Sequence, residues 1–565
     1  MSNGPPKKTK VRRLAKVLGA VVLLVIGFLV FANIQDINTK NSEEATPLHR
    51  AAANNATETA QRLITQGAEI CAKDTLGRTP LHWAAWYNAA ETTELLLTQG
   101  AKINEKDEYG QTPLHQATRN NATETAQLLL TQGADIYAKG NKGSTPLHWA
   151  AAQNAAETAQ RLITWGANIN TKDSEEATPL HWAAANNANK TANLLLTQGA
   201  EICAKDTLGL TPLHWAAGNN TAEMANLLLT QGANVNEKGE SGETPLHRAA
   251  MNNAVETAEI LLIRGANVNE KDQDGDMPLH YAAWNNADET AQLLIAQGAE
   301  INAKTDKGST PLHHTAQKNA TETAQLLLTQ EAEINAKTDQ SATPLHHAAW
   351  KNATETAQLL IRQGAEICAK DTLGRTPLHW TAWNNAAETT KVLLTQGANI
   401  NEKDQYGQTP LHRAAWNNST ETAQLLLTQG ANINEKDQYG QTPLHNAVCE
   451  NAIETAQLLI TQGAEINAKA DEGQTPLHHA AWQNATETAQ LLLTQGAEIN
   501  AKNDKGLTPL HDAARMDATA TAELLLKQGA EVNAESDEGL TPLHIATEHN
   551  AIETAELLNR YGGRE

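Results

Sequence analysis

The sequence is poor in the large side chains that usually fill a protein core. Its 565 residues include only 2 phenylalanines and 5 methionines. Leucine, isoleucine and alanine must therefore make most of the apolar contacts. A chain of this length would ordinarily form several separate domains.

The sequence also lacks the motifs that place catalytic or cofactor-binding groups at fixed spacing. It contains no GxxxxGK[ST], no GxGxxG after a strand, no HExxH and no GxSxG. Aspartate and glutamate recur about once per copy of a repeated unit, where a solvated acidic face accounts for them. We therefore expect neither an enzyme nor a protein with a cofactor.

What the sequence does contain is one unit, repeated at a fixed period. The element TPLH, with one Met in place of Thr, recurs every 33 residues without insertion or deletion. Its sixteen starts are Thr46, Thr79, Thr112, Thr145, Thr178, Thr211, Thr244, Met277, Thr310, Thr343, Thr376, Thr409, Thr442, Thr475, Thr508 and Thr541. A constant period of this size indicates stacked repeats, each burying its apolar face against its neighbours.

The copy over residues 409–441 shows how the unit is built. Pro410 suits the first position of a helix, where its missing N–H costs nothing. Asn418 is suited to end that helix in a left-handed conformation, and this position is Asn in fifteen copies and Asp517 in the other. A second, leucine-rich helix is expected from about residue 420 to residue 429, with Gly430 ending it. The rest of the unit carries turn residues and predicts an extended, hairpin-like loop.

TPLHxAA, a leucine-rich second helix, Gly-Ala and a turn with Asp and Gly, repeated every 33 residues, resemble the ankyrin repeat. The resemblance covers residues 37–563 and implies an all-α solenoid of about sixteen helix-turn-helix repeats. Members of this family often have Gly-His between the two helices, where this chain has Asn followed by a small residue. The resemblance also implies that the TPLH histidines, such as His412, belong to a hydrogen-bond network between repeats.

The spacing argues against metal sites and disulfides. One TPLH histidine per repeat places the imidazoles about 10 Å apart, whereas Zn–N bonds are about 2 Å. Cys71, Cys203 and Cys368 share one repeat position and are separated by four and five repeats. That separation far exceeds the roughly 7 Å limit for a disulfide. We expect these three cysteines and Cys449 to be unpaired and no metal to be bound.

The N-terminus differs from the repeats. Residues 1–16 contain six cations and no acid, and residues 17–32 form an uncharged apolar run. Residues 17–36 are thus expected to be one hydrophobic helix that anchors the protein in a membrane, or a cleaved secretory signal. The charge asymmetry predicts a single-pass protein with its basic end, residues 1–16, in the cytoplasm and the repeats on the far side. Cleavage would instead leave a secreted or periplasmic protein.

The remainder of the chain is acidic, because the whole chain has a formal net charge of −22 despite its basic start. An acidic repeat domain does not bind nucleic acid by neutralising phosphates. Its charge favours a protein partner with a basic surface.

Aromatic residues mark two positions of the first helix. Trp149, Trp182 and Trp215 share one position in three consecutive repeats, and for these we favour packing against the neighbouring repeat. The second position lies three residues later, on the same helical face, and the family resemblance places it with the loop tips on a concave partner-binding surface. Because Trp and Tyr are enriched at binding hot spots, we predict partner contact at this position and at two loop tips, by Trp86, Trp284, Trp350, Trp383, Trp416, Trp482, Tyr406 and Tyr439.

One junction departs from the repeat. Glu331 replaces the glycine that ends the second helix, and Ser341 replaces the glycine of the next tip. A non-glycine residue with positive φ is strained, so the junction between repeats 9 and 10 is predicted to open most easily. The leading hypothesis for function is a membrane-anchored binding scaffold. The alternatives are a secreted ankyrin-repeat effector and a passive structural spacer.

Overall fold

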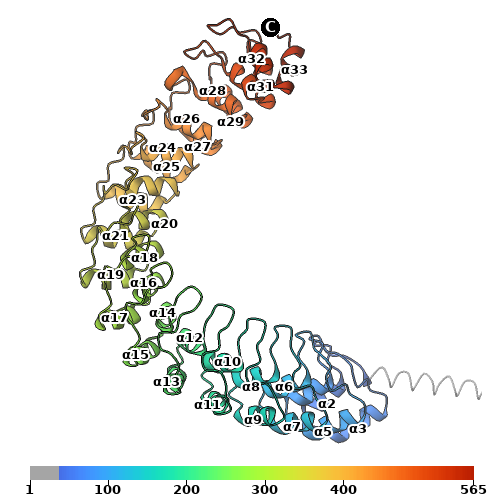
Figure 1. Cartoon of the computed structure of the whole chain (residues 1–565). Coiled ribbons are helices and arrows are strands. Elements are labelled where there is room, and N and C mark those ends of the chain that lie inside the picture. The colour runs from blue at the N-terminus through green and yellow to red at the C-terminus, as the bar shows by residue number, and fades with distance from the viewer. Residues whose placement is uncertain (1–36) are drawn as a thin grey trace, which may run out of the picture. The chain divides into compact units, whose positions relative to one another are not determined.

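A computed structural model describes residues 37–565 of the chain (Figure 1). The basic segment 1–16 and the expected hydrophobic helix within 17–36 lie outside the described residues. Within residues 37–565 the secondary structure is helical, and no helix is both long and apolar enough to cross a membrane. The helices group into two units, one ending at Asp272 and the other beginning at Gln273.

The first unit contains seven helix pairs. Its first helices are α2 (Pro47–Ala53), α4 (Pro80–Trp86), α6 (Pro113–Arg119), α8 (Pro146–Ala152), α10 (Pro179–Ala185), α12 (Pro212–Gly218) and α14 (Pro245–Met251). Its second helices are α3 (Thr57–Thr65), α5 (Ala90–Thr98), α7 (Thr123–Thr131), α9 (Ala156–Thr164), α11 (Asn189–Thr197), α13 (Ala222–Thr230) and α15 (Val255–Ile263). In Figure 1, α6, α8 and α10 lie side by side in one layer, and α7, α9 and α11 form a second layer.

The second unit contains nine pairs. Its first helices are α16 (Pro278–Trp284), α18 (Pro311–Lys318), α20 (Pro344–Lys351), α22 (Pro377–Trp383), α24 (Pro410–Trp416), α26 (Pro443–Cys449), α28 (Pro476–Trp482), α30 (Pro509–Arg515) and α32 (Pro542–Glu548). Its second helices are α17 (Asp288–Ala296), α19 (Thr321–Thr329), α21 (Thr354–Arg362), α23 (Ala387–Thr395), α25 (Thr420–Thr428), α27 (Ile453–Thr461), α29 (Thr486–Thr494), α31 (Thr519–Lys527) and α33 (Ile552–Arg560). A single 3-10 turn, η1 (Asp471–Gly473), lies in one loop.

The TPLH element starts each first helix and also joins it to the next repeat. Thr409 is extended and Pro410 is the first residue of α24. The backbone N–H of Thr409 donates to Nδ1 of His412 at 3.1 Å, while Nε2 of His412 lies 3.1 Å from the carbonyl oxygen of Gln441. A backbone N–H can only donate and a carbonyl can only accept, so the neutral ring carries its proton on Nε2. The structural role expected for the TPLH histidines is therefore confirmed.

The turn between the two helices has the predicted left-handed residue. Asn418 has φ of 52°, and the equivalent Asn or Asp517 has positive φ in every repeat. Gly430 ends α25 with φ of 91°, and no atom lies within 4 Å of the position that a Cβ would occupy there. Positive φ is thus the reason for glycine at this position. Glu331 adopts the same region, with φ of 64°.

Apolar contacts lie between the two helix layers and between neighbouring repeats. In repeat 12 the buried residues are Leu411, Ala414 and Ala415 of α24 and Ala423 and Leu426 of α25. The alanines let adjacent helices approach closely. Each repeat therefore depends on its neighbours for burial, as the sequence predicted.

The long loops fold back on themselves, and adjacent loops are joined through the backbone. In repeat 13 the N–H of Asp437 donates to the carbonyl of Gln441 at 2.9 Å, and the N–H of Gln438 donates to the carbonyl of Tyr406 at 2.9 Å. Oδ1 of Asp437 accepts the N–H groups of Tyr439 and Gln441. The expected hairpin-like loops are confirmed, and their tips have a fixed position.

A ladder of lysines also connects successive repeats. Nζ of Lys403 donates to the carbonyl of Lys436 at 3.1 Å and pairs with Glu435 at 2.7 Å. Lys436 and Lys469 in turn donate to the carbonyls of Lys469 and Lys502. The same bond joins lysines 33 residues apart in the first unit, as at Lys106 and Lys139.

Candidate partner-binding surface

Most tryptophans at the earlier first-helix position are fixed by a carboxylate of their own repeat. Nε1 of Trp182 donates to Oδ2 of Asp173 at 2.9 Å, and Nε1 of Trp215 donates to Oδ2 of Asp206 at 2.8 Å. Trp83 and Trp380 make the same bond, to Asp74 and Asp371. These rings also pack edge-on against histidines of the preceding repeat. The interpretation of this position as packing is supported, and Trp380, which sequence reasoning did not single out, belongs to the same set.

Five of the eight predicted partner-binding residues line a single groove in the second unit. Trp383, Trp416 and Trp482 come from α22, α24 and α28, and Tyr406 and Tyr439 come from loop tips. The groove has a volume of about 650 Å³. Tyr439 is 51% exposed and Trp482 is 37% exposed. We call this site the aromatic groove.

The aromatic groove is nearly neutral inside an acidic chain. Arg413 lines it, but Nη2 of Arg413 lies 2.5 Å from Oδ2 of the buried Asp404, and the guanidinium lies 5.9 Å from the ring centre of Trp383. Its charge is therefore internally paired. The polar lining consists largely of amides, from Gln408, Gln441, Gln474 and Gln483. Flat aromatic rings beside amide donors and acceptors suit a ligand with both apolar groups and peptide-like polar groups.

A cysteine and a histidine meet in the wall of the groove. Sγ of Cys449 lies 3.1 Å from Nδ1 of His479. Burial raises the pKa of Cys449 to about 12, with a smaller contribution from Glu450, and burial lowers the pKa of His479 to about 4. Both groups are therefore neutral near pH 7, and the thiol donates to the ring without being a thiolate nucleophile. No group of three His, Cys, Asp or Glu residues that could hold a metal occurs within residues 37–565.

The other three predicted residues lie outside the aromatic groove. Trp350 is 38% exposed and packs edge-on against Trp380, with ring centres 5.5 Å apart. Nζ of Lys318 lies 4.1 Å from the ring centre of Trp284. Thus, of the expected row Trp350–Trp383–Trp416, the first member faces a different environment.

Trp86 lies in the first unit. It lines a smaller cavity of about 220 Å³ with Trp83 and Tyr87, and the guanidinium of Arg119 lies 5.4 Å from its ring centre. Partner contact at Trp86, Trp284 and Trp350 stays a prediction.

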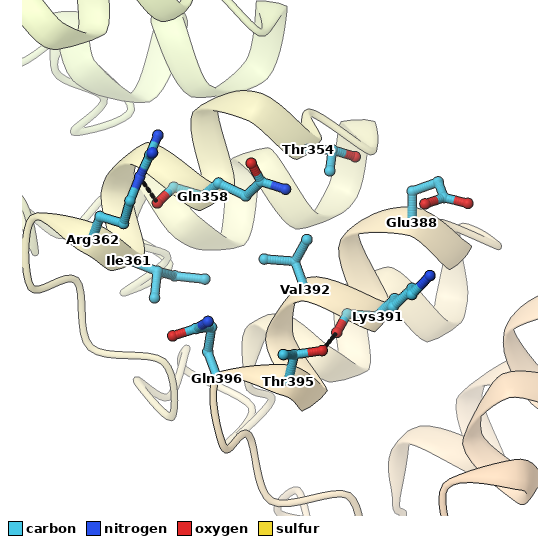
Figure 2. A pocket seen from close by; sticks show the side chains of 9 residues that line it. All are labelled: Thr354, Gln358, Ile361, Arg362, Glu388, Lys391, Val392, Thr395 and Gln396. Carbon is cyan, nitrogen blue, oxygen red and sulfur yellow. Dashed lines mark hydrogen bonds between the residues drawn. The ribbon is translucent and has the colours of Figure 1, made fainter.

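A separate cavity lies on the second helices of the second unit, between α21 and α23. Figure 2 shows its lining, with Ile361 and Val392 near the centre and Arg362, Glu388 and Lys391 around them. Its volume is about 400 Å³. Val392 stands where the neighbouring repeats have Leu359 and Leu425, so a smaller side chain contributes to the hollow. Charges of both signs are present, and the lining has no aromatic residue.

Paired helices at a 33-residue period, joined by loops with hydrogen-bonded tips, define the class of helix-turn-helix repeat proteins. The chain belongs to the ankyrin repeat family. The family model described as ankyrin repeats (3 copies) matches residues 17–107, 99–173, 138–206, 180–272, 279–371, 363–437, 427–503 and 487–564. Ankyrin repeats indicate a scaffold for protein–protein interaction and are generally non-catalytic. No curated protein matches the sequence.

Proposed function

We propose that this protein is a non-catalytic scaffold that binds a polypeptide partner through the aromatic groove. The observation that carries the proposal is the convergence of Trp383, Trp416 and Trp482 with two tyrosines on one groove. Tryptophan and tyrosine supply large, rigid contact areas at hot spots. The glutamines beside them offer donors and acceptors for a peptide backbone.

The chemistry of the groove describes the partner. The interior favours an apolar or aromatic segment, because its one arginine is already paired with Asp404. The acidic chain around it, with a net charge of −22, favours basic residues on either side of that segment. Raising the salt concentration should therefore slow association more than it speeds dissociation.

The test is site-directed crosslinking in the intact protein. A photoreactive residue at Gln474, which lines the groove, should capture the partner, whereas one at Gln358 on the second-helix cavity serves as the matched control. The triple change Trp383→Ala, Trp416→Ala and Trp482→Ala should weaken binding at least about tenfold. Trp165→Ala, at an exposed position of the first unit, should leave it unchanged.

Retention of every partner by the triple variant, with circular dichroism matching the parent protein, would end this proposal. That result would favour the passive spacer. Equal capture from Gln474 and Gln358 would also count against the groove, because it would show contact without preference for the aromatic side.

Residues 17–36 carry the proposal of a membrane anchor, with residues 1–16 in the cytoplasm and the repeats on the far side. The support is the uncharged run after six cations. Sequencing the N-terminus of the mature protein separates the anchor from a cleaved signal. A mature chain beginning at Asn33 would instead support a secreted or periplasmic protein.

A further inference from the structure

Trp149 is the exception among the tryptophans at the earlier first-helix position. Its Nε1 is buried and has no hydrogen-bond partner. Its ring packs edge-on against Trp182, with ring centres 5.2 Å apart. A buried N–H without an acceptor is rare in folded proteins, so this one requires an explanation.

The explanation lies in the loop before α8. In repeats 2, 5, 6 and 11 the residue nine positions before the tryptophan is an aspartate, and it accepts the indole N–H. In repeat 4 that residue is Gly140. Repeat 4 therefore keeps the donor and lacks the carboxylate that satisfies it elsewhere.

The unpaired tryptophan lines the largest cavity found in the first unit, of about 750 Å³. Trp149, Trp182 and Trp215 contribute its helical side, and Tyr109 and Leu76 contribute apolar surface from the loops. We call it the first-unit groove. It is lined by residues of five successive repeats, which is a length suited to an extended segment.

Cations gather beside Trp149 within this groove. The guanidinium of Arg119 lies 4.6 Å from its ring centre, and Lys142 lines the same cavity. Neither Arg119 nor Lys142 forms an ion pair within the described part of the chain. Of the two acids in the lining, Asp173 is occupied by Trp182 and by the N–H groups of Glu175 and Ala177. Glu175 remains as the one acid that opposes an incoming anion.

We propose that the first-unit groove is a second binding site, which receives a polypeptide segment through an aspartate or glutamate side chain. The carboxylate takes the place of the aspartate missing at Gly140, where it accepts the Trp149 N–H and pairs with Arg119. Apolar neighbours of that side chain pack on Tyr109 and Leu76. The site differs from the aromatic groove, whose arginine is already paired.

The test uses the full-length protein labelled with 5-fluorotryptophan, whose twelve tryptophans give separate fluorine signals. Trp149→Phe assigns the signal of Trp149. The probes are the acetylated, amidated peptide Gly-Gly-Asp-Gly-Gly, its Gly-Gly-Asn-Gly-Gly twin, and acetate. Trp182 is the internal control, because its N–H is already bound to Asp173.

The aspartate peptide should shift the Trp149 signal saturably, at a concentration about tenfold below that needed by the asparagine twin. Arg119→Gln should weaken the response about tenfold. Gly140→Asp should shift the signal without any probe and abolish the response, since the missing carboxylate is then supplied internally. Gly140 does not have positive φ, and the nearest contact of an added Cβ is 3.3 Å, so this variant is compatible with the fold.

Three results would overturn the proposal. The first is an equal response to both peptides, and the second is a response that persists in Gly140→Asp. The third is saturation by acetate at the concentration of the aspartate peptide, which would show an adventitious anion site without contact to the chain of a peptide. No response to any probe, up to the solubility limit, would also overturn it.

Discussion

The side-chain oxygen of Asn418 accepts the backbone N–H of Thr455 at 3.2 Å and the hydroxyl of Thr455 at 2.9 Å, across the boundary between two repeats. Thr455 lies in the first turn of α27. Nδ2 of Asn418 also donates to Glu454 at 2.7 Å. One asparagine thus ends the first helix of its own repeat and caps the second helix of the next.

Replacing Asn418 separates these two roles. Asn418→Gly keeps the left-handed turn but loses the cap, so we expect the junction to lose about 1 kcal/mol. Asn418→Ala loses both and should cost about 2–3 kcal/mol, because alanine is strained at positive φ. Native-state hydrogen exchange of the α27 amides measures both changes. Equal protection in Asn418→Gly and the parent protein would show that the cap contributes nothing.

The buried TPLH histidines predict a steep loss of stability in mild acid. Burial lowers the pKa values of His82, His115 and His346 to about 4, from an ordinary value near 6.5. Above pH 6.5 these rings are neutral in both the folded and the unfolded chain, so their contribution is fully present. Between pH 6.5 and about 4 the unfolded chain binds more protons, and each such histidine lowers the free energy of unfolding by up to about 1.4 kcal/mol per pH unit.

Urea unfolding at pH 7.0, 6.0 and 5.0 tests this expectation. The midpoint should fall steadily, because protonation removes the Nδ1 acceptor that holds the N–H of residues such as Thr409. Asp512 acts in the opposite direction, since burial raises its pKa to about 7, but it is one group against many. A midpoint that stays constant down to pH 5 would contradict the burial of the neutral rings.

The four cysteines should differ sharply in reactivity. Cys71, Cys203 and Cys368 are exposed, whereas the thiol of Cys449 is largely buried and donates to His479. Because burial raises the pKa of Cys449 to about 12, iodoacetamide at pH 8 should modify it at least about a hundredfold more slowly than the other three. Mass spectrometry of the native protein measures the four rates. Denaturation in urea is the control and should make them equal.

Glu331 carries strain that its counterparts avoid. Its φ is 64°, at a position that is glycine in the other repeats. Glu331→Gly should stabilise the junction between α19 and α21 by about 1 kcal/mol, as seen by hydrogen exchange. Gly430→Glu, the reverse change at the equivalent position of repeat 12, should destabilise its own junction by a similar amount. Uniform protection of the parent protein across repeats 8 to 11 would refute the predicted weak junction.

The fold was open to prediction because its signals are local to each unit. The left-handed conformation of Asn418 follows from the residue type and its place after a helix. Its bond to Thr455 does not, because the partner lies 37 residues further along and the direction of the side chain depends on how repeats stack. That bond also accounts for asparagine where family members often have Gly-His, since glycine has no side chain with which to cap a neighbour.

The candidate site was predictable in position but not in grouping. The repeat register correctly placed Trp383, Trp416 and Trp482 on equivalent points of their helices, and the structure brings them together. Trp350 occupies the same register position and instead packs on Trp380, because a tryptophan stands beside it in the next repeat. Which rings remain free is decided by neighbours 30 residues away, a spacing that a scan for short motifs does not examine.

The lysine ladder makes every junction it spans chemically alike. Lys403 finds in Lys436 the same carbonyl that Lys436 finds in Lys469, so one repeat can follow almost any other without loss of these bonds. A duplication or deletion of 33 residues would therefore leave both sides of the scar correctly joined. The near-identical segments around Cys71 and Cys368 are what such events leave behind. The number of repeats is thus free to vary between relatives, and the chain separating any two binding sites should grow or shrink only in whole repeats.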